Sequence, residues 1–270
     1  MKNLILASLA IILCCVSCSA APQTKNLDVK STFKGLLVKS NIEVVYTVAS
    51  KVEIKVTAEA EVIDNVVATV SGDILTLDYN GKNKNTNSKI KVYLKAPALQ
   101  SITTAQNAGV KCDRNLIIGE IGLKAYDNSE IKIGSITADN AVMEAQANAE
   151  IKVGDITCPN MILNASANAG ISCKQLSSNN LIIDARDNAE VTVKNLGAVV
   201  ITANSSSNAE ISLKGRASVA TFTATANSEI SAADLTVNSG TATAGDTATI
   251  RCHVIDLTKN VQGMGRIKNS

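Results

Sequence analysis

The chain is poor in aromatic residues, proline and histidine. Phe, Trp and Tyr make up 2% of its 270 residues, tryptophan is absent, and there are 3 prolines and 1 histidine. The core must therefore be aliphatic, which suits a narrow interior with little room for rings. The Gly-x-Ser-x-Gly and His-Glu-x-x-His patterns are missing too. The sequence therefore lacks the motifs that would indicate a serine hydrolase or a zinc protease.

The chain also has no large excess of charge of either sign. The 26 basic and 24 acidic residues leave a formal net charge of +2. Such a balance creates no field that would draw the chain to nucleic acid or to an anionic membrane face. We therefore exclude nucleic acid as a partner.

The N-terminus has the pattern of an export signal. Lys2 precedes an apolar run over residues 4–13, and small residues lead to Cys18. This resembles a bacterial lipoprotein cleavage box, so we expect residues 1–18 to be a signal peptide and the mature chain to begin at a lipid-modified Cys18. Plain cleavage near Ala20 is the alternative. The prediction is an exported outer-membrane lipoprotein that meets the membrane through its lipid, with the periplasmic or surface side left open.

One short sequence recurs along the chain at a nearly constant spacing. An Asn is followed by Ala or Ser, then Glu or Gly, then Ile or Val, every 19 to 21 residues, and Thr247 begins a degenerate eighth copy. A fixed period of this length indicates a solenoid whose units must stack to bury their apolar side. The seven asparagines are Asn107, Asn128, Asn148, Asn168, Asn188, Asn208 and Asn227.

Each unit contains three short runs in which apolar and polar residues alternate. This pattern predicts an all-β, parallel β-helix, right-handed like most parallel crossovers, with three strands per coil of about 20 residues. Equivalent residues should then stack in columns about 4.8 Å apart. The asparagines are interpreted as structural corners, because Asn tolerates left-handed backbone. Three residues before them, a column of small residues marks an inward bend: Ala125, Ala145, Ala165, Ala185, Ser205 and Ala224.

The expected domain boundaries follow from changes in the pattern of alternating apolar and polar residues. We expect a linker over residues 19–30 and a single β-helix domain over residues 31–265. Within it, the longer alternating runs of residues 31–104 are lead-in strands that close the first coil, and residues 105–255 are the repeat coils. Residues 256–270 are expected to form a C-terminal cap or tail.

Four cysteines remain after the signal peptide. Cys112, Cys173 and Cys252 stand five residues after a corner, where other units carry Ile, Val or Leu, and Cys158 is the fourth. Cys112 and Cys173 would lie three coils apart, roughly 14 Å and beyond disulfide reach. We therefore predict free, buried thiols. The single histidine, His253, follows Cys252 directly, and adjacent strand residues point to opposite faces, so the two do not form a nucleophile pair.

An outward column of glutamates is the sharpest candidate for chemistry. Lysines accompany the first ones, whereas Glu190, Glu210 and Glu229 have Thr or Ser in that place. Stacked carboxylates repel, so these three form a weak candidate for Ca²⁺. A solvated acidic face with no metal and no cofactor is the favoured interpretation.

Glycan-active β-helix enzymes are the main rival class. Glutamates one coil apart match the carboxylate separation of retaining glycosidases. However, every glutamate here has an equivalent environment, while catalysis needs two different ones. The repeats also offer only two aromatic rings, Tyr126 and Phe222. We expect no enzymatic activity and no catalytic residues.

Several segments resemble a known family. The opening Phe-x-Gly-Leu at Phe33, the Gly-Asp-x-Leu-x-Leu at Gly72, the Ala-Pro-Ala-Leu at Ala96 and the Asn/Ser-Ala-Glu-Ile ladder are similar to the auto-transporter adhesin "head GIN domain" proteins, over roughly Phe33 to Gly265. The resemblance implies a β-helix, export, and an adhesion role in the envelope of Bacteroidetes-type bacteria. It supplies no catalytic motif. Cys15 at the start of the cleavage box and Asn at the corners depart from the family's usual residues.

Together these features predict a non-enzymatic, lipid-anchored protein of the cell envelope. Its β-helix walls would serve adhesion, scaffolding or the binding of an unknown envelope protein or glycan. The alternative is a β-helix protein that binds or degrades a polysaccharide.

Overall fold

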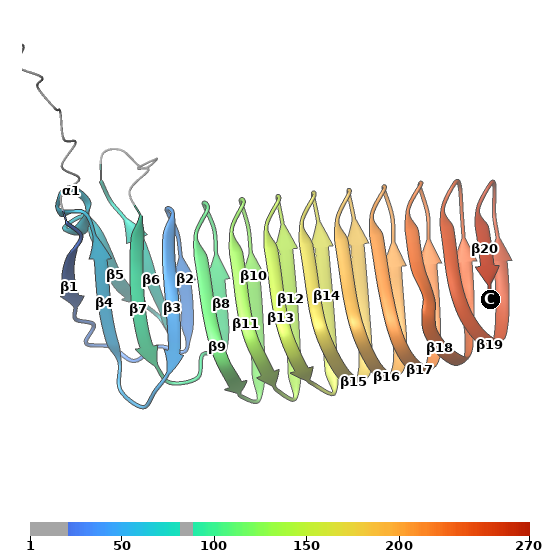
Figure 1. Cartoon of the computed structure of the whole chain (residues 1–270), viewed down its shortest axis with the longest axis horizontal. Helices are drawn as coiled ribbons and strands as arrows, with labels where there is room; N and C mark the ends of the chain where they lie inside the picture. The colour runs from blue at the N-terminus through green and yellow to red at the C-terminus, as the bar shows by residue number, and fades with distance from the viewer. Residues whose placement is uncertain (1–20, 82–88) are drawn as a thin grey trace, which may run out of the picture.

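The structure, a computed structural model, describes residues 21–81 and 89–270 and is a long parallel β-solenoid (Figure 1). Strands stack side by side from the N-terminal to the C-terminal end of the rod. The predicted signal peptide and Cys18 lie outside the described residues. In the described part, the helical structure is one four-residue segment, so no helix there is long and apolar enough to cross a membrane.

The predicted parallel β-helix is confirmed. Each repeat strand pairs in parallel with the equivalent strand one coil away, as in Ile131 with Ile151 and Ile151 with Ile171. The repeat strands are β8 (Ser101–Thr104), β9 (Gly109–Ile117), β10 (Glu120–Ala125), β11 (Glu130–Thr137), β12 (Asn140–Gln146), β13 (Glu150–Thr157), β14 (Asn160–Ser166), β15 (Gly170–Arg186), β16 (Glu190–Ser205), β17 (Glu210–Ala224), β18 (Glu229–Ala244), β19 (Thr249–Val261) and β20 (Arg266–Asn269).

The three runs of each coil are present, but they are not three separate strands. β13 pairs with β15 in two blocks, 150–153 and 155–157, and β14 forms the third block at 160–166. A single residue bends the chain between the first two blocks, so they stay one strand. From β15 onward even the third run joins without a break. The bends after the first and second runs are therefore gentler than the sequence suggested, because the strand continues through the first of them and, from β15 onward, through both. The corner at the asparagine column, in contrast, ends the strand in every coil.

Inward columns of aliphatic residues fill the interior. From Val110 to Ile250, the column three residues after the corner is at most 3% exposed. Burying each Ile or Val side chain contributes about 1.5–3 kcal/mol of transfer free energy, so the stacked columns supply much of the driving force. The small-residue column before the corner is buried as well, at 2% or less. The first column consists of Val110, Ile131, Ile151, Ile171, Val191, Ile211, Ile230 and Ile250.

The asparagine corners adopt the predicted left-handed backbone. All seven asparagines have φ between 60° and 64°, and the residue before each has φ between 51° and 57°. The second left-handed residue was not anticipated; at three corners it is alanine, including Ala147 and Ala167. Amide-to-amide bonds join Asn148 to Asn128 at 3.2 Å and Asn227 to Asn208 at 2.7 Å. The stacking supports an otherwise unfavourable conformation.

The N-terminal region is also solenoidal, but its coils do not follow chain order. β2 (Gly35–Val38) pairs with both β6 (Ile74–Tyr79) and β8, while β3 (Ile42–Val48) pairs with both β7 (Ile90–Ala96) and β9. The coil of β6 and β7 is thus nearer the N-terminal end of the rod than the coil of β2 and β3. After β7 the chain passes the β2–β3 coil and begins β8 on its other side. The lead-in is therefore more than a closing segment, because it contributes two coils of its own.

Antiparallel strands close the N-terminal end. β4 (Glu53–Ala58) pairs antiparallel with β7, and β5 (Val66–Ser71) does so with β6. β1 (Gln23–Leu27) then covers β4, so the linker expected over residues 19–30 is wrong in part: five of its residues form a strand. Antiparallel additions of this kind remove the open parallel edge.

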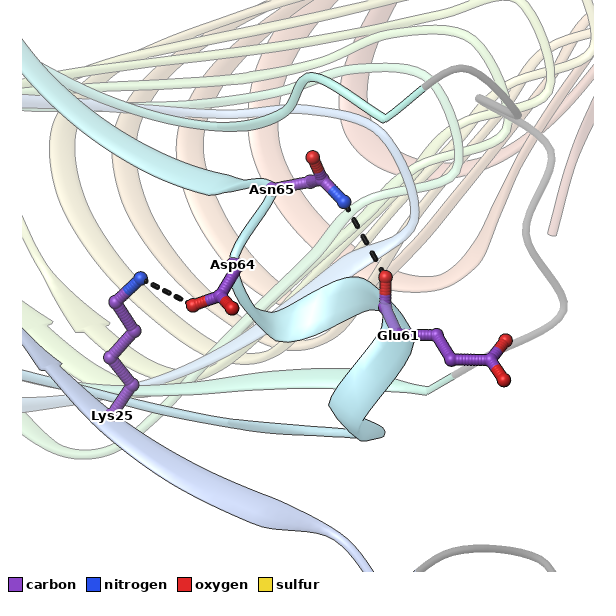
Figure 2. Close-up of polar contacts among 4 residues, drawn as sticks. All are labelled: Lys25, Glu61, Asp64 and Asn65. Carbon is purple, nitrogen blue, oxygen red and sulfur yellow. Dashed lines mark hydrogen bonds and ion pairs between the residues drawn. The ribbon is translucent and has the colours of Figure 1, made fainter.

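The short helix α1 (Ala60–Ile63) lies between β4 and β5 in the chain, at the same end of the rod (Figure 1). Lys25 of β1 contacts Asp64 at 2.8 Å, and the Asn65 side chain donates to the backbone carbonyl of Glu61 at 3.4 Å (Figure 2). Val62 and Ile63 of this helix are buried. The helix therefore covers the apolar interior that the first coil would otherwise expose.

The C-terminal end is finished differently. β20 pairs with only four residues of β19, and residues 256–270 are largely exposed, so they extend the last coils rather than forming a folded cap. Lys259 pairs with Ala242 and thus occupies an inward column of the final coil. A charged residue at an inward position is a known device against pairing with further strands.

The four described cysteines are free and buried, as predicted. Cys112, Cys173 and Cys252 pair with Ile133, Val153 and Ala232, which confirms their shared column. Burial raises the pKa of the Cys173 thiol to about 12. These thiols act as small apolar residues.

Candidate binding surfaces

The glutamate column forms one outer wall of the solenoid. Strand register places Glu190 beside Glu210 and Glu210 beside Glu229. In the earlier coils, Lys152 contacts Glu150 at 2.6 Å and Glu130 at 3.6 Å, and these carboxylates raise its pKa. Lysines thus neutralise the first part of this wall, as the sequence indicated.

Two of the later glutamates, Glu190 and Glu229, also have side-chain partners. Arg251, from the last coil, forms an ion pair with Glu229 and takes the role that lysines have in the first coils. Thr192 also donates to Glu190 at 2.9 Å. Sequence comparison along one column missed Arg251 because it replaces the hydroxyl residue only in the coil after Glu229.

The Ca²⁺ candidate gains no support from the geometry. Over residues 21–81 and 89–270, no group of three or more His, Cys, Asp and Glu side chains is arranged to hold a metal ion. Glu190, Glu210 and Glu229 are stacked one per coil along a flat wall, which does not surround a cation. They are better described as an acidic surface.

A different wall carries a groove, which we call the amide groove. It has a volume of 490 Å³, within the range of ordinary ligand sites. Its lining comes from five consecutive coils and mixes carboxylates, amides, hydroxyls and one guanidinium. The polar lining residues are Glu144, Gln146, Asn164, Ser166, Asp184, Arg186, Asn204, Ser205, Ser206, Thr223 and Thr225.

Two columns on the third run of each coil build the amide groove. One stands four residues before the corner and joins Glu144, Asn164, Asp184, Asn204 and Thr223 in direct register. The other stands two residues before the corner, where the small Ser166 separates Gln146 from Arg186. Because serine is short, the surface is hollowed between its larger neighbours.

Side chains within the amide groove hold one another in place. Asn204 donates to Asp184 at 2.8 Å, and Gln146 donates to Glu144 at 2.7 Å. Lys124 forms an ion pair with Glu144 at 3.2 Å. Arg186 is looser, since its nearest carboxylate, Asp187, is 3.9 Å away and its side chain is 66% exposed. The groove therefore combines oriented groups with one movable cation.

Tyr126 stands next to one end of the amide groove. Burial, followed by a hydrogen bond to Glu144 and the charge of that carboxylate, raises the pKa of the tyrosine hydroxyl to about 12. The bond draws the tyrosine toward a lining residue of the groove. The other aromatic residue of the repeats, Phe222, is fully buried.

The amide groove was not identified from the sequence, although a signal for it exists. Its main column recurs with the same period as the corner asparagines, but its residue type changes from coil to coil, so no motif repeats.

A second amide ladder was missed because asparagine does not continue along its column. Asn160 donates to Asn140 at 3.1 Å and Asn180 donates to Asn160 at 3.0 Å, but Val200 replaces asparagine in the next coil.

Solved structures share this architecture. The crystal structure of a putative adhesin from Parabacteroides distasonis matches with a TM-score of 0.69 and 14% identity, over 93% of this chain and 98% of that one. One from Parabacteroides merdae, also a putative adhesin, matches at 0.65 and 14% identity, over 93% and 96%. A putative lipid binding protein from Parabacteroides distasonis matches at 0.65 and 16%, over 93% and 97%. At these identities the matches establish the fold.

The sequence itself also shows a similarity to a known family. No curated protein matches the chain. A family profile does match, from just before Phe33 into β13, which includes the N-terminal coils and the first repeats. The resemblance predicted from the sequence is thereby confirmed for this part of the chain. Residues 32–155 match the model of the family described as "Putative auto-transporter adhesin, head GIN domain".

Proposed function

We propose that this protein is a non-enzymatic adhesion or scaffold protein of the cell envelope, exported and anchored by lipid on Cys18. The family description and two of the structural relatives name adhesins. The export signal and cleavage box motivate the anchor. The partner is an envelope protein or a glycan that meets the walls of the solenoid.

One observation carries the binding role: the solenoid presents a groove that spans five coils and is lined by preoriented polar side chains. Such side chains lose little conformational freedom when a ligand binds, which favours recognition. A stack of equivalent coils is also rigid along its axis, so surface groups keep fixed spacings over a long distance. These properties suit an extended partner better than a small substrate.

The anchor is tested by labelling cells with a palmitate analogue. The expected result is label on the wild-type protein, recovery in the membrane fraction, and loss of both in Cys18→Ala. A Cys14→Ala variant is the matched control and should keep its label. Label that persists in Cys18→Ala would refute the anchor.

The adhesion role is tested separately with the mature chain fixed to beads. Beads should bind cells or cell-envelope fragments above the level of beads coated with an unrelated β-rich protein. Equal binding by both would contradict the proposal. Hydrolysis products released from a panel of polysaccharides would instead favour an enzyme.

A further inference from the structure

We propose that the amide groove binds a neutral oligosaccharide laid across the coils. This inference rests on the proposed binding function and names the ligand class for one surface. The groove is the hollow on the wall that combines Glu144, Asn164, Asp184, Arg186 and Asn204.

The lining matches the hydrogen-bonding chemistry of sugars. A sugar hydroxyl both donates and accepts, and neighbouring hydroxyls present this capacity in pairs. Planar amides and carboxylates offer two polar atoms side by side, and serine and threonine hydroxyls add single groups of either kind. In the amide groove, Asn164, Asp184 and Asn204 occupy one continuous column. Each can therefore meet a pair of hydroxyls in successive coils.

The dimensions favour a chain over a single ring. The lining comes from five coils, which at about 4.8 Å per coil span roughly 19 Å. A polar side chain recurs at each step of the main column, so a ligand with its own repeat can make one hydrogen bond or more per coil along its length. Tyr126, whose hydroxyl bonds to Glu144, stands beside that end of the groove.

The charges favour a neutral glycan over a polyanion. Glu144 and Asp184 line the groove together with one guanidinium, Arg186. Lys124 forms an ion pair with Glu144, whereas Asp184 accepts a hydrogen bond from the neutral amide of Asn204. A uronate-rich or sulfated chain would bring further negative charge beside Asp184. Like charges at this range are repulsive and only partly screened by salt.

The backbone argues against an extended peptide. Peptides commonly add to a free strand edge or insert side chains into apolar pockets. The strands beneath the amide groove, β12, β14, β15, β16 and β17, pair with one another in a continuous sheet. Their backbone groups are used in these ladders, and most of the residues that line the groove are polar.

The experiment applies the mature protein to an array of neutral, sialylated and uronate-rich oligosaccharides, followed by calorimetric titration with the best neutral binder. Asp184→Ala and Asn164→Ala should each weaken the affinity at least tenfold, and Ser206→Trp should abolish binding by filling the groove. Lys194→Ala is the control: this exposed residue of β16 does not line the groove, so the variant should bind as the wild type does. Circular dichroism and Tm measurements establish that each variant is folded.

Three outcomes would overturn the inference. They are binding confined to charged glycans, absence of binding to every neutral glycan, and equal weakening by Lys194→Ala and Asp184→Ala. If Ser206→Trp fails to fold, Asp184→Ala and Asn164→Ala still decide the question. If mature protein on beads binds cells while the array stays blank, the amide groove assignment is wrong and the adhesion role stands. If the beads also fail, both are wrong.

Discussion

The N-terminal coils and the repeat coils use the same kind of strand but connect them differently. In the repeats, every strand pairs with a neighbour about 20 residues away, as Ile171 does with Val191. In the N-terminal region, Gly35 pairs with Ser101, and between them the chain builds a further coil and an antiparallel cap. The repeat coils are therefore stabilised by contacts between segments about 20 residues apart, and the N-terminal coils by contacts between segments far apart in the sequence.

This difference separates two ways of stabilising a solenoid. Nearest-neighbour stacking lets repeats form and open one by one. Long-range pairing requires several segments to assemble together, and such contacts form slowly. The N-terminal region should thus behave as one cooperative unit and as the base on which the repeat coils stack. Variants in matched positions of the two regions can break or sharpen this comparison.

The largest expected effect is that of Leu94→Ala in β7. Leu94 is fully buried and pairs with Tyr46 on one side and Ile54 on the other, so its strand joins the first coil to the cap. Cavity formation should cost about 2–5 kcal/mol of unfolding free energy. Urea denaturation followed by circular dichroism measures this loss, and hydrogen exchange should show faster opening throughout the N-terminal coils together.

Leu163→Ala in β14 is the matched change in the repeats. Leu163 is also fully buried, so the loss in free energy should be similar. Opening should, however, be confined to the neighbouring coils, with the N-terminal region still protected. Identical exchange patterns for the two variants would break the comparison, because both regions would then unfold as a single unit.

A smaller effect is expected at the corners, which the two regions share. Asn188 has φ of 62°, and Asn41, at the corner between β2 and β3, has φ of 57°. Alanine in left-handed backbone costs roughly 1–2 kcal/mol, whereas glycine adopts it freely. Asn188→Ala and Asn41→Ala should both lower Tm by several degrees, while the glycine variants stay close to wild type. An equal loss for glycine would mean that the side-chain amide, not the backbone, matters.

The shared corner explains what the sequence could and could not reveal about the fold. In the repeats, Asn recurs at a constant period, so the coils were predictable from spacing alone. Ser40 and Asn41 form the same corner, but no equivalent residue lies 20 positions away in the chain. The N-terminal coils are separated by the antiparallel cap, and this long insertion hides their relationship. Strand order there depends on tertiary packing that no local pattern encodes.

Binding surfaces were less predictable for a related reason. The glutamate wall was evident because one residue type recurs. The amide groove depends on variation between coils, since a short Ser166 between Gln146 and Arg186 creates the hollow. A repeat pattern predicts which side chains stack, but not where a change in size leaves space. Comparison of whole columns, rather than motifs, would have located it.

A third prediction concerns the alkaline stability of the repeat coils. Burial raises the pKa of Cys173 from 9.0 to about 12, so the folded protein keeps this proton over a range in which the unfolded chain loses it. The contribution of Cys173 to stability is complete below pH 9 and decreases as pH rises toward 12. Cys173→Val, which matches Val153 and Val193 in the same column, should leave Tm nearly unchanged at neutral pH and raise it relative to wild type at higher pH. An unchanged difference across pH would contradict this.

The smallest effects are expected from ion pairs at the two ends. Lys25 pairs with Asp64 in the N-terminal cap, and Arg251 pairs with Glu229 near the C-terminal end. All four side chains are at least 36% exposed, so solvent screens both pairs, and each should contribute about 0.2–1 kcal/mol or less. Lys25→Ala and Arg251→Ala should therefore shift the urea midpoint only slightly, and less at high salt. A larger, salt-insensitive loss for Lys25→Ala would mean that β1 docking is coupled to the whole cap, which would sharpen the contrast between closure at one end and simple stacking at the other.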